Sequence, residues 1–200
     1  ADRARCSGCL VSAPDRGSVS VGGSHGGDTS PDFDLVVVGA GLAGLVAAVR
    51  AAELGRRVAL LEKGAGDEYP CNSRYSGGIF HVSYHDPKDD SKRLLEAMTE
   101  ATAGYASEAL RNVFAEQAGA SIDWLRTHGA RFIRGAIDWH AWVLAPPRPP
   151  TTGLDWKGRG ADALLRALTR LATELKVHRL TGTRAESLHP VSYTHLTLPT

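Results

Sequence analysis

Three glycines and a later glutamate are the residues whose types and spacing indicate chemistry. Gly39, Gly41 and Gly44 form a Gly-x-Gly-x-x-Gly run, and Glu62 follows at close to the roughly 20-residue spacing of an acid that holds a ribose. Such glycines permit a tight turn, close approach of a pyrophosphate and close packing of a helix. A carboxylate accepts hydrogen bonds from ribose hydroxyls and would repel a 2′-phosphate. The pattern predicts a dinucleotide site formed by Gly39, Ala40, Gly41, Leu42, Ala43, Gly44 and Glu62.

The segments around the glycines are those that such a site needs. Residues 34–38 form an apolar, β-branched run typical of a buried parallel strand, residues 45–54 an Ala-rich helix, and residues 58–61 a second strand. The helix would direct its N–H groups and its dipole at the pyrophosphate. A glycine run alone is a weak signal, but the ordered strand, turn, helix, strand and acid favour a nucleotide site over a ligand-free turn.

A second glycine-containing loop follows at residues 69–80, with the sequence YPCNSRYSGGIF. Asn72 and Ser73 can donate hydrogen bonds to phosphate or ribityl oxygens, while Gly77 and Gly78 would let the backbone lie against a flat ring. By itself this segment is typical of an ordinary Gly-rich turn. Its position after the nucleotide-binding pattern favours a flavin contact.

Together these motifs resemble the fumarate reductase/succinate dehydrogenase flavoprotein family, in its soluble branch, which includes tricarballylate dehydrogenases and 3-ketosteroid dehydrogenases. The residues that carry the resemblance are Glu62-Lys63, Asn72-Ser73 and Ser76-Gly77-Gly78. The resemblance implies an α/β fold: the N-terminal part of a Rossmann-like FAD-binding domain, with a helical stretch between the second and third sheet strands. It implies FAD as cofactor, with further contacts from Lys63, Asn72, Ser73, Ser76, Gly77, Gly78 and the backbone of Ala185.

The two ends of the chain are expected to lie outside this domain, which we place at residues 32–190. Residues 1–31 are small and polar, lack hydrophobic periodicity and are expected to be disordered. Residues 191–200, VSYTHLTLPT, resemble one translation frame of a transposase mosaic-end adapter from sequencing libraries. We therefore expect an adapter artefact there, and a parent protein that continues with sequence of its own.

Helical patterns dominate the middle of the chain. Residues 91–128 have the periodicity of two or three amphipathic helices, with breaks near Gly104 and Gly119. The prolines of residues 145–152 indicate an irregular loop. The remaining predicted elements are a helix over 163–175, a third strand of the same sheet over 177–180, and its continuation after a turn over 183–188.

Composition excludes several classes of function. The net charge of +1 gives no electrostatic reason to expect a nucleic-acid partner, and no apolar run approaches the length of a membrane span. Three cysteines do not make a disulfide framework, so we expect a cytoplasmic setting. His81 and His85 lack further ligands at matched spacing, so no metal site is predicted.

The family resemblance implies hydride transfer between flavin N5 and a carbon next to a carboxylate or carbonyl, with a small carboxylate or ketone as substrate. In that family the catalytic Arg and His lie downstream of the matched region, so no catalytic residue and no electron-transfer partner is assigned. Arg74 is interpreted as a surface or structural residue. We expect the 200-residue chain alone to be inactive.

Two alternatives remain open on sequence grounds. An NAD-binding dehydrogenase domain would continue with regular βα repeats after Glu62, whereas a glycine loop and a helical stretch follow. A non-catalytic FAD-binding module is compatible with every motif above, because the catalytic region is not among them.

FAD is predicted to bind without a covalent bond. Family members that attach FAD use a histidine in or near the second glycine loop, where this chain has Arg74, Tyr75 and Ser76. Acid precipitation of the FAD-loaded protein should therefore leave a colourless pellet and a yellow supernatant. A yellow pellet would contradict the prediction, and free FAD mixed with an unrelated protein is the control.

Overall fold

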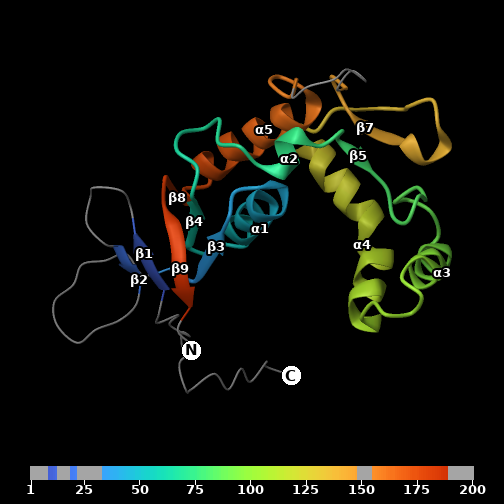
Figure 1. Ribbon diagram of the computed structural model, residues 1–200, viewed down its shortest axis with the longest axis horizontal. Helices are drawn as coiled ribbons and strands as arrows, with labels where there is room; N and C mark the ends of the chain where they lie inside the picture. The colour runs from blue at the N-terminus through green and yellow to red at the C-terminus, as the bar shows by residue number, and fades with distance from the viewer. Residues whose placement is uncertain (1–8, 13–18, 22–32, 148–154, 189–200) are drawn as a thin grey trace. The chain divides into compact units, whose positions relative to one another are not determined.

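The structure is a computed structural model that describes residues 9–12, 19–21, 33–147 and 155–188. The chain forms two compact units, residues 1–70 with 169–200, and residues 71–168, and helix α5 contributes to both (Figure 1). The elements of the first unit are β1 (Cys9–Ser12), β2 (Val19–Val21), β3 (Leu35–Val38), α1 (Leu42–Glu53), β4 (Val58–Glu62), the end of α5 (Gly160–Glu174), β8 (His178–Thr181) and β9 (Arg184–Leu188).

A parallel three-stranded sheet, ordered β3-β4-β8, organises the first unit. Leu35 pairs with Val58 at one end of β3, and Glu62 pairs with Thr181 at the carboxyl end of β4. The second unit intervenes in the chain between β4 and β8. The predicted strands, and the helical stretch between the second and third of them, are therefore confirmed.

The central strand β4 is buried along its whole length, whereas both ends of β3 and of β8 are exposed. On one face Ala59 and Leu61 pack with Phe33, Val36 and Leu180. Helix α1 contacts the sheet and lies along it in Figure 1. It lies on the face opposite Val36, because its Gly44 approaches the side chain of Val37, and neighbouring strand residues point to opposite faces.

A second sheet of the first unit has the order β2-β1-β9 and is antiparallel. We expected residues 183–188 to continue the third strand of the parallel sheet, and this was wrong. Gly182, at a positive φ of 67°, turns the chain, and β9 pairs with β1 instead.

The expectation that residues 1–31 lack regular structure was also wrong where the structure describes them. The valines of β1 and β2 favour strands, and both strands hydrogen-bond into the sheet of β9. A sequence pattern cannot reveal such pairing, because the partner strand lies far along the chain. The rest of this segment, and the adapter-like residues 191–200, lie outside the described residues.

The second unit combines a small antiparallel sheet, ordered β5-β7-β6, with helices. Within the described residues, no helix is long and apolar enough to cross a membrane. The elements of this unit are α2 (Asn72–Tyr75), β5 (Ile79–Phe80), α3 (Ser91–Ala101), α4 (Glu108–Thr127), β6 (Phe132–Ile133), the 3-10 helix η1 (Asp138–His140), β7 (Trp142–Leu144) and the start of α5.

Helices α3 and α4 confirm the predicted amphipathic stretch and lie side by side (Figure 1). Their contact buries Leu94, Met98 and Ala115. The predicted break near Gly119 is wrong, because α4 continues through it. A Cβ on Gly119 would lie 3.4 Å from the carbonyl oxygen of Pro87, an ordinary contact distance, so this position inside the helix has room for alanine.

Helix α5 begins at Gly160, earlier than the predicted residue 163. The start of the helix requires a glycine, because it lies very close to β7. The N–H of Gly160 donates a hydrogen bond to the carbonyl of Pro146, and a Cβ at Gly160 would lie 2.4 Å from the carbonyl carbon of Leu144. Of the irregular loop expected at residues 145–152, residues 145–147 are described and form no helix or strand, and residues 148–152 lie outside the described residues.

The Asp34 side chain, just before β3, accepts hydrogen bonds from Arg57, just before β4. From this contact we predict that the stability of the fold depends on pH. The backbone N–H of Arg57, followed by its guanidinium, donates to the Asp34 carboxylate and lowers the pKa of Asp34. A lowered folded-state pKa gives stability that is present above the ordinary carboxyl pKa, near pH 4, and is lost as pH falls through the folded value.

Asp34→Asn should therefore reduce stability at neutral pH and flatten its decline toward acid, as measured by urea unfolding across a pH series. Glu96→Gln, at an exposed carboxylate of α3, is the control and should leave the profile unchanged. An acid decline as steep in Asp34→Asn as in the parent chain would contradict the prediction.

Candidate dinucleotide-binding site

The turn between β3 and α1 has the shape that its glycines allow. Gly39 adopts a φ of +94°, which only glycine takes at little cost, and its N–H donates to the carbonyl of Leu61 at 2.7 Å. A Cβ at Gly44 would lie 1.8 Å from the carbonyl oxygen of Gly39. The two glycines thus permit a sharp reversal and a helix that packs directly on the turn.

Helix α1 begins without a side-chain cap. Gly41 is its N-cap residue, and the carbonyl of Gly41 accepts a hydrogen bond from the N–H of Leu45 at 2.9 Å. The cap offers no side-chain acceptor, and the first turn of the helix contains no acidic residue. A helix N-terminus of this kind attracts an anion such as a pyrophosphate through its N–H groups and its dipole.

The carboxylate of Glu62 lies directly against this turn. Its side chain is buried, with one oxygen accepting the N–H of Ala40 at 2.9 Å and the other accepting the N–H of Gly64 at 2.8 Å. The sequence predicted a ribose contact for Glu62 but not these two bonds. A carboxylate has about four acceptor positions, so Glu62 can still accept from ribose hydroxyls.

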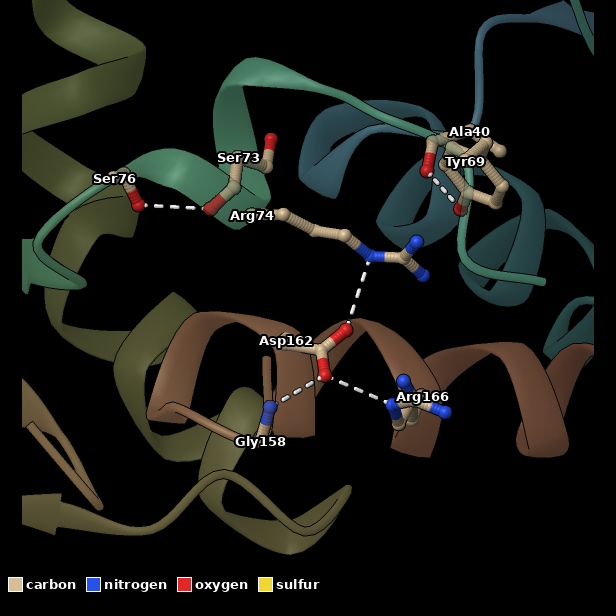
Figure 2. Close-up of polar contacts among 8 residues, drawn as sticks. All are labelled: Ala40, Tyr69, Ser73, Arg74, Ser76, Gly158, Asp162 and Arg166. Atoms are coloured by element: carbon tan, nitrogen blue, oxygen red, sulfur yellow. Dashed lines mark hydrogen bonds and ion pairs between the residues drawn. The ribbon is translucent and has the colours of Figure 1, made fainter. Parts of the chain in front are cut away.

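Tyr69 is a site residue that the sequence analysis missed. It is fully buried, and its hydroxyl donates a 2.6 Å hydrogen bond to the carbonyl of Ala40 (Figure 2). Gly64 makes room for it, since a Cβ there would lie 2.3 Å from the Tyr69 Cβ. Both polar groups of the Ala40 residue are therefore held, its N–H by Glu62 and its carbonyl by Tyr69. No sequence signal marks Tyr69, because its partner is a backbone atom.

Two further predicted contacts belong to the first unit. Lys63 is exposed beside Glu62. Ala185 lies in β9 opposite Val11 of β1. Binding of FAD by either residue stays a prediction.

The second glycine loop lies in the second unit and contains a short helix where we expected only a loop. The N–H groups of Arg74 and Tyr75 donate to the carbonyl of Cys71, which closes the single turn of α2. After the turn, the Ser76 hydroxyl donates to the carbonyl of Ser73 at 2.9 Å and accepts the N–H of Gly78 at 3.3 Å.

The predicted flavin-contacting residues differ in exposure. Asn72, Ser76 and Gly77 are exposed, Ser73 is half-buried and Gly78 is buried. Gly78 has a φ of +69°, and a Cβ there would lie 3.0 Å from the Cβ of Leu144. Exposed amide and hydroxyl groups can bind a polar ligand, and Gly78 is needed where the loop joins the β5-β7-β6 sheet.

Arg74, at the centre of this loop, forms a buried ion pair. Its Nε lies 3.1 Å from Oδ1 of Asp162, with side chains 1% and 0% exposed (Figure 2). The interpretation of Arg74 as a structural residue agrees with this position. The sequence does not distinguish Asp162, because an acidic residue is common in the first turn of a helix.

The sequence-predicted site residues thus divide between the two units. The glycine turn, Glu62, Lys63 and Ala185 belong to the first, and residues 72–78 to the second. Within the described residues, no group of three or more His, Cys, Asp or Glu side chains is arranged to hold a metal ion. The geometry of the first unit fits the ADP part of a dinucleotide: a glycine turn, a helix whose N-cap residue is a glycine, and a buried carboxylate.

A model of a family of FAD-binding domains matches residues 34–195. The chain belongs to this family. FAD is its cofactor, and the predicted relation to FAD-dependent oxidoreductases is confirmed. The match covers the glycine turn, Glu62 and the second glycine loop together, so it favours FAD over the NAD-binding alternative.

Individual relatives agree with this assignment. The chain is 29% identical over 168 residues to the vinyl phenol reductase of Lactiplantibacillus plantarum, a match that covers 78% of this chain and 31% of the reductase. A 3-ketosteroid-Δ4-(5α)-dehydrogenase from Rhodococcus jostii RHA1 superposes with a TM-score of 0.55 at 20% identity, over 75% of this chain and 38% of the dehydrogenase.

A flavocytochrome c3 fumarate reductase superposes with a TM-score of 0.54 at 22% identity, over 74% of this chain and 26% of the reductase. At such identities the two solved structures establish the fold alone. The chain spans less than half the length of each of these relatives.

Gly44 provides a direct test of the turn. Gly44→Ala places a Cβ against the carbonyl of Gly39, so the turn must open, at a cost of about 3 kcal/mol in the free energy of unfolding and with weaker FAD binding. Gly119→Ala is the matched control inside α4, where alanine favours the helix by up to about 1 kcal/mol. Urea unfolding measures both variants. A loss below about 1 kcal/mol for Gly44→Ala would show that the turn tolerates a side chain.

Proposed function

We propose that the chain is the ADP-binding part of an FAD-dependent oxidoreductase that moves hydride between flavin N5 and a carbon next to a carboxylate or carbonyl. The observation that carries the proposal is the Glu62 carboxylate bonded to the N–H of Ala40 in the glycine turn, which leads into helix α1 at Gly41. An acid held at this place can bind a ribose while the turn binds the adjoining pyrophosphate.

Each part of the chain has a separate role in this proposal. The turn of residues 39–44 binds the pyrophosphate, Glu62 accepts from the ribose hydroxyls, and the backbone of Ala185 contacts the adenine. The loop of residues 72–78 contacts the flavin end through Asn72, Ser73 and the peptide groups of its glycines. FAD supplies the redox chemistry when bound, and the protein contributes binding, orientation and electrostatics.

The substrate class is supported by the names of the relatives. Fumarate is a dicarboxylate with a carbon–carbon double bond, and the Rhodococcus dehydrogenase was solved with 4-androstene-3,17-dione, a ketone with such a bond. Vinyl phenol also contains a carbon–carbon double bond, although it has no carbonyl. We therefore propose a small molecule with an activated carbon–carbon bond, most simply a carboxylate or ketone.

We further propose that the 200-residue chain binds FAD without turning over substrate. Reduction of a conjugated acid needs a cation for the developing negative charge and a proton donor. In the resembled family these groups come from parts of the protein beyond the segment matched here. The relatives contain more than twice the matched length, which leaves room for such groups.

FAD titration of the chain tests the binding half of the proposal. FAD fluorescence should be quenched on binding, ADP should compete, and NAD should compete only through its ADP half. Glu62→Gln should raise the dissociation constant for FAD about tenfold or more, because a charged acceptor for hydroxyl and N–H donors is lost. Glu96→Gln is the matched control at an exposed position.

The redox half is tested after anaerobic photoreduction of the bound flavin, in the chain and in any longer product of the same gene. An unsaturated carboxylate or ketone should restore the yellow oxidised flavin in the longer product, while its saturated analogue should not. Absence of FAD binding would overturn the whole proposal. Binding without reoxidation in the longer product would favour the non-catalytic FAD module.

A further inference from the structure

We propose that the buried ion pair of Arg74 and Asp162 fixes the conformation of the loop of residues 72–78 and thereby sets its affinity for FAD. Both are then positioning residues, acting through the loop rather than by touching the reacting atoms. That the ion pair fixes the loop is inferred from the geometry of the second unit alone. That it affects FAD affinity rests on the proposed function.

Burying this pair costs desolvation free energy, because two charges are removed from water. Nε of Arg74 and Oδ1 of Asp162 are 3.1 Å apart, and neither side chain is more than 1% exposed. Breaking such a pair by removing one partner leaves an uncompensated buried charge, whereas replacing both by apolar side chains is often neutral. A buried pair is therefore weak evidence for stability. Nε and Oδ1 attract each other as charges without a hydrogen bond between them, so the pair acts by holding the loop and the start of α5 together.

Asp162 is tied into the start of α5 by further bonds. Its Oδ2 accepts the N–H of Gly158 at 2.9 Å and Nε of Arg166 at 2.9 Å (Figure 2). The carboxylate also lies in the first turn of α5, where the helix dipole favours negative charge. Asp162 is thus a fixed anchor, held by its own helix and by the turn that precedes it.

The loop docks on this anchor through α2. Arg74 reaches Asp162, and its guanidinium carbon also lies 5.7 Å from the ring centre of Trp156. The ring of Tyr75 meets the same Trp156 edge-on, with centroids 5.9 Å apart. Neighbouring residues of α2 therefore both contact the segment of residues 156–162, which fixes the rotation of the short helix.

Local bonds carry this orientation to the predicted flavin contacts. Ser73 is adjacent to Arg74, and its carbonyl accepts a hydrogen bond from the Ser76 hydroxyl (Figure 2). The same hydroxyl oxygen accepts a hydrogen bond from the N–H of Gly78. At its other end the loop is held by the N–H of Leu144, which donates to the carbonyl of Gly78 at 2.8 Å. A single helical turn has no stability of its own, so its direction depends on these tertiary anchors.

The test uses the full 200-residue chain and two readouts, hydrogen exchange of the amides in residues 72–78 and FAD affinity. Asp162→Asn and Arg74→Met should each speed exchange in this segment at least about tenfold and raise the FAD dissociation constant by a similar factor. Arg74→Lys keeps the cation and should retain most of the affinity. Asp155→Asn removes the charge from an exposed pair with Arg159 at the same helix entrance and should change neither readout.

Loss of folding in a single variant is addressed by Arg74→Met combined with Asp162→Leu, which leaves no buried charge. We expect this double variant to keep the parent circular dichroism, with fast exchange in residues 72–78 and weak FAD binding. Parent-like protection and FAD affinity in the double variant would overturn the proposal, because the pair would then be space-filling.

The two proposals fail in different ways. If the amides of residues 72–78 exchange at the parent rate in Asp162→Asn, the ion pair does not fix the loop, even where FAD binds normally. Absence of FAD binding by the parent chain overturns the proposed function, and with it the effect of the pair on FAD affinity. Faster exchange in the same variant would then still support the fixed loop.

Discussion

A single buried carboxylate determines the geometry of the nucleotide-binding turn. Glu62 bonds the N–H of Ala40 with one oxygen and the N–H of Gly64 with the other, so it joins the end of β4 to the turn after β3. Charge-assisted bonds of this kind are stronger than those between neutral groups, and burial raises the cost of losing them. The helix N-terminus of α1 and its approach to a pyrophosphate depend on this turn.

Tyr69 completes the constraint from the other side of the same residue. Its hydroxyl donates a hydrogen bond to the carbonyl of Ala40. The carbonyl of Glu62 in turn accepts a hydrogen bond from the N–H of Thr183, the residue that precedes β9. The turn is therefore held by side chains from two later segments of the chain. An FAD-binding domain gains from this arrangement because the ligand meets a preorganised turn and does not have to order it.

The second unit uses the same physical device in a different place. Arg74 and Asp162 form a buried charged contact, and by our proposal it fixes the shape of the loop of residues 72–78. In both units the glycines supply unusual backbone conformations, and buried charged groups prevent the resulting flexibility. Apolar packing between α3 and α4 supports the second unit but does not by itself set the direction of a loop.

The sequence by itself determined the nucleotide turn, because the conformations and close contacts at Gly39 and Gly44 demand glycine, and the apolar runs around them specify the parallel strands. It also determined the FAD family, through the spacing of Glu62 and the second glycine loop. Tertiary structure alone decided the roles of Tyr69 and Asp162, the path of α4 through Gly119 and the pairing of β9 with β1. These features depend on partners distant in the chain, or on space beside a residue, and neither leaves a local pattern in the sequence.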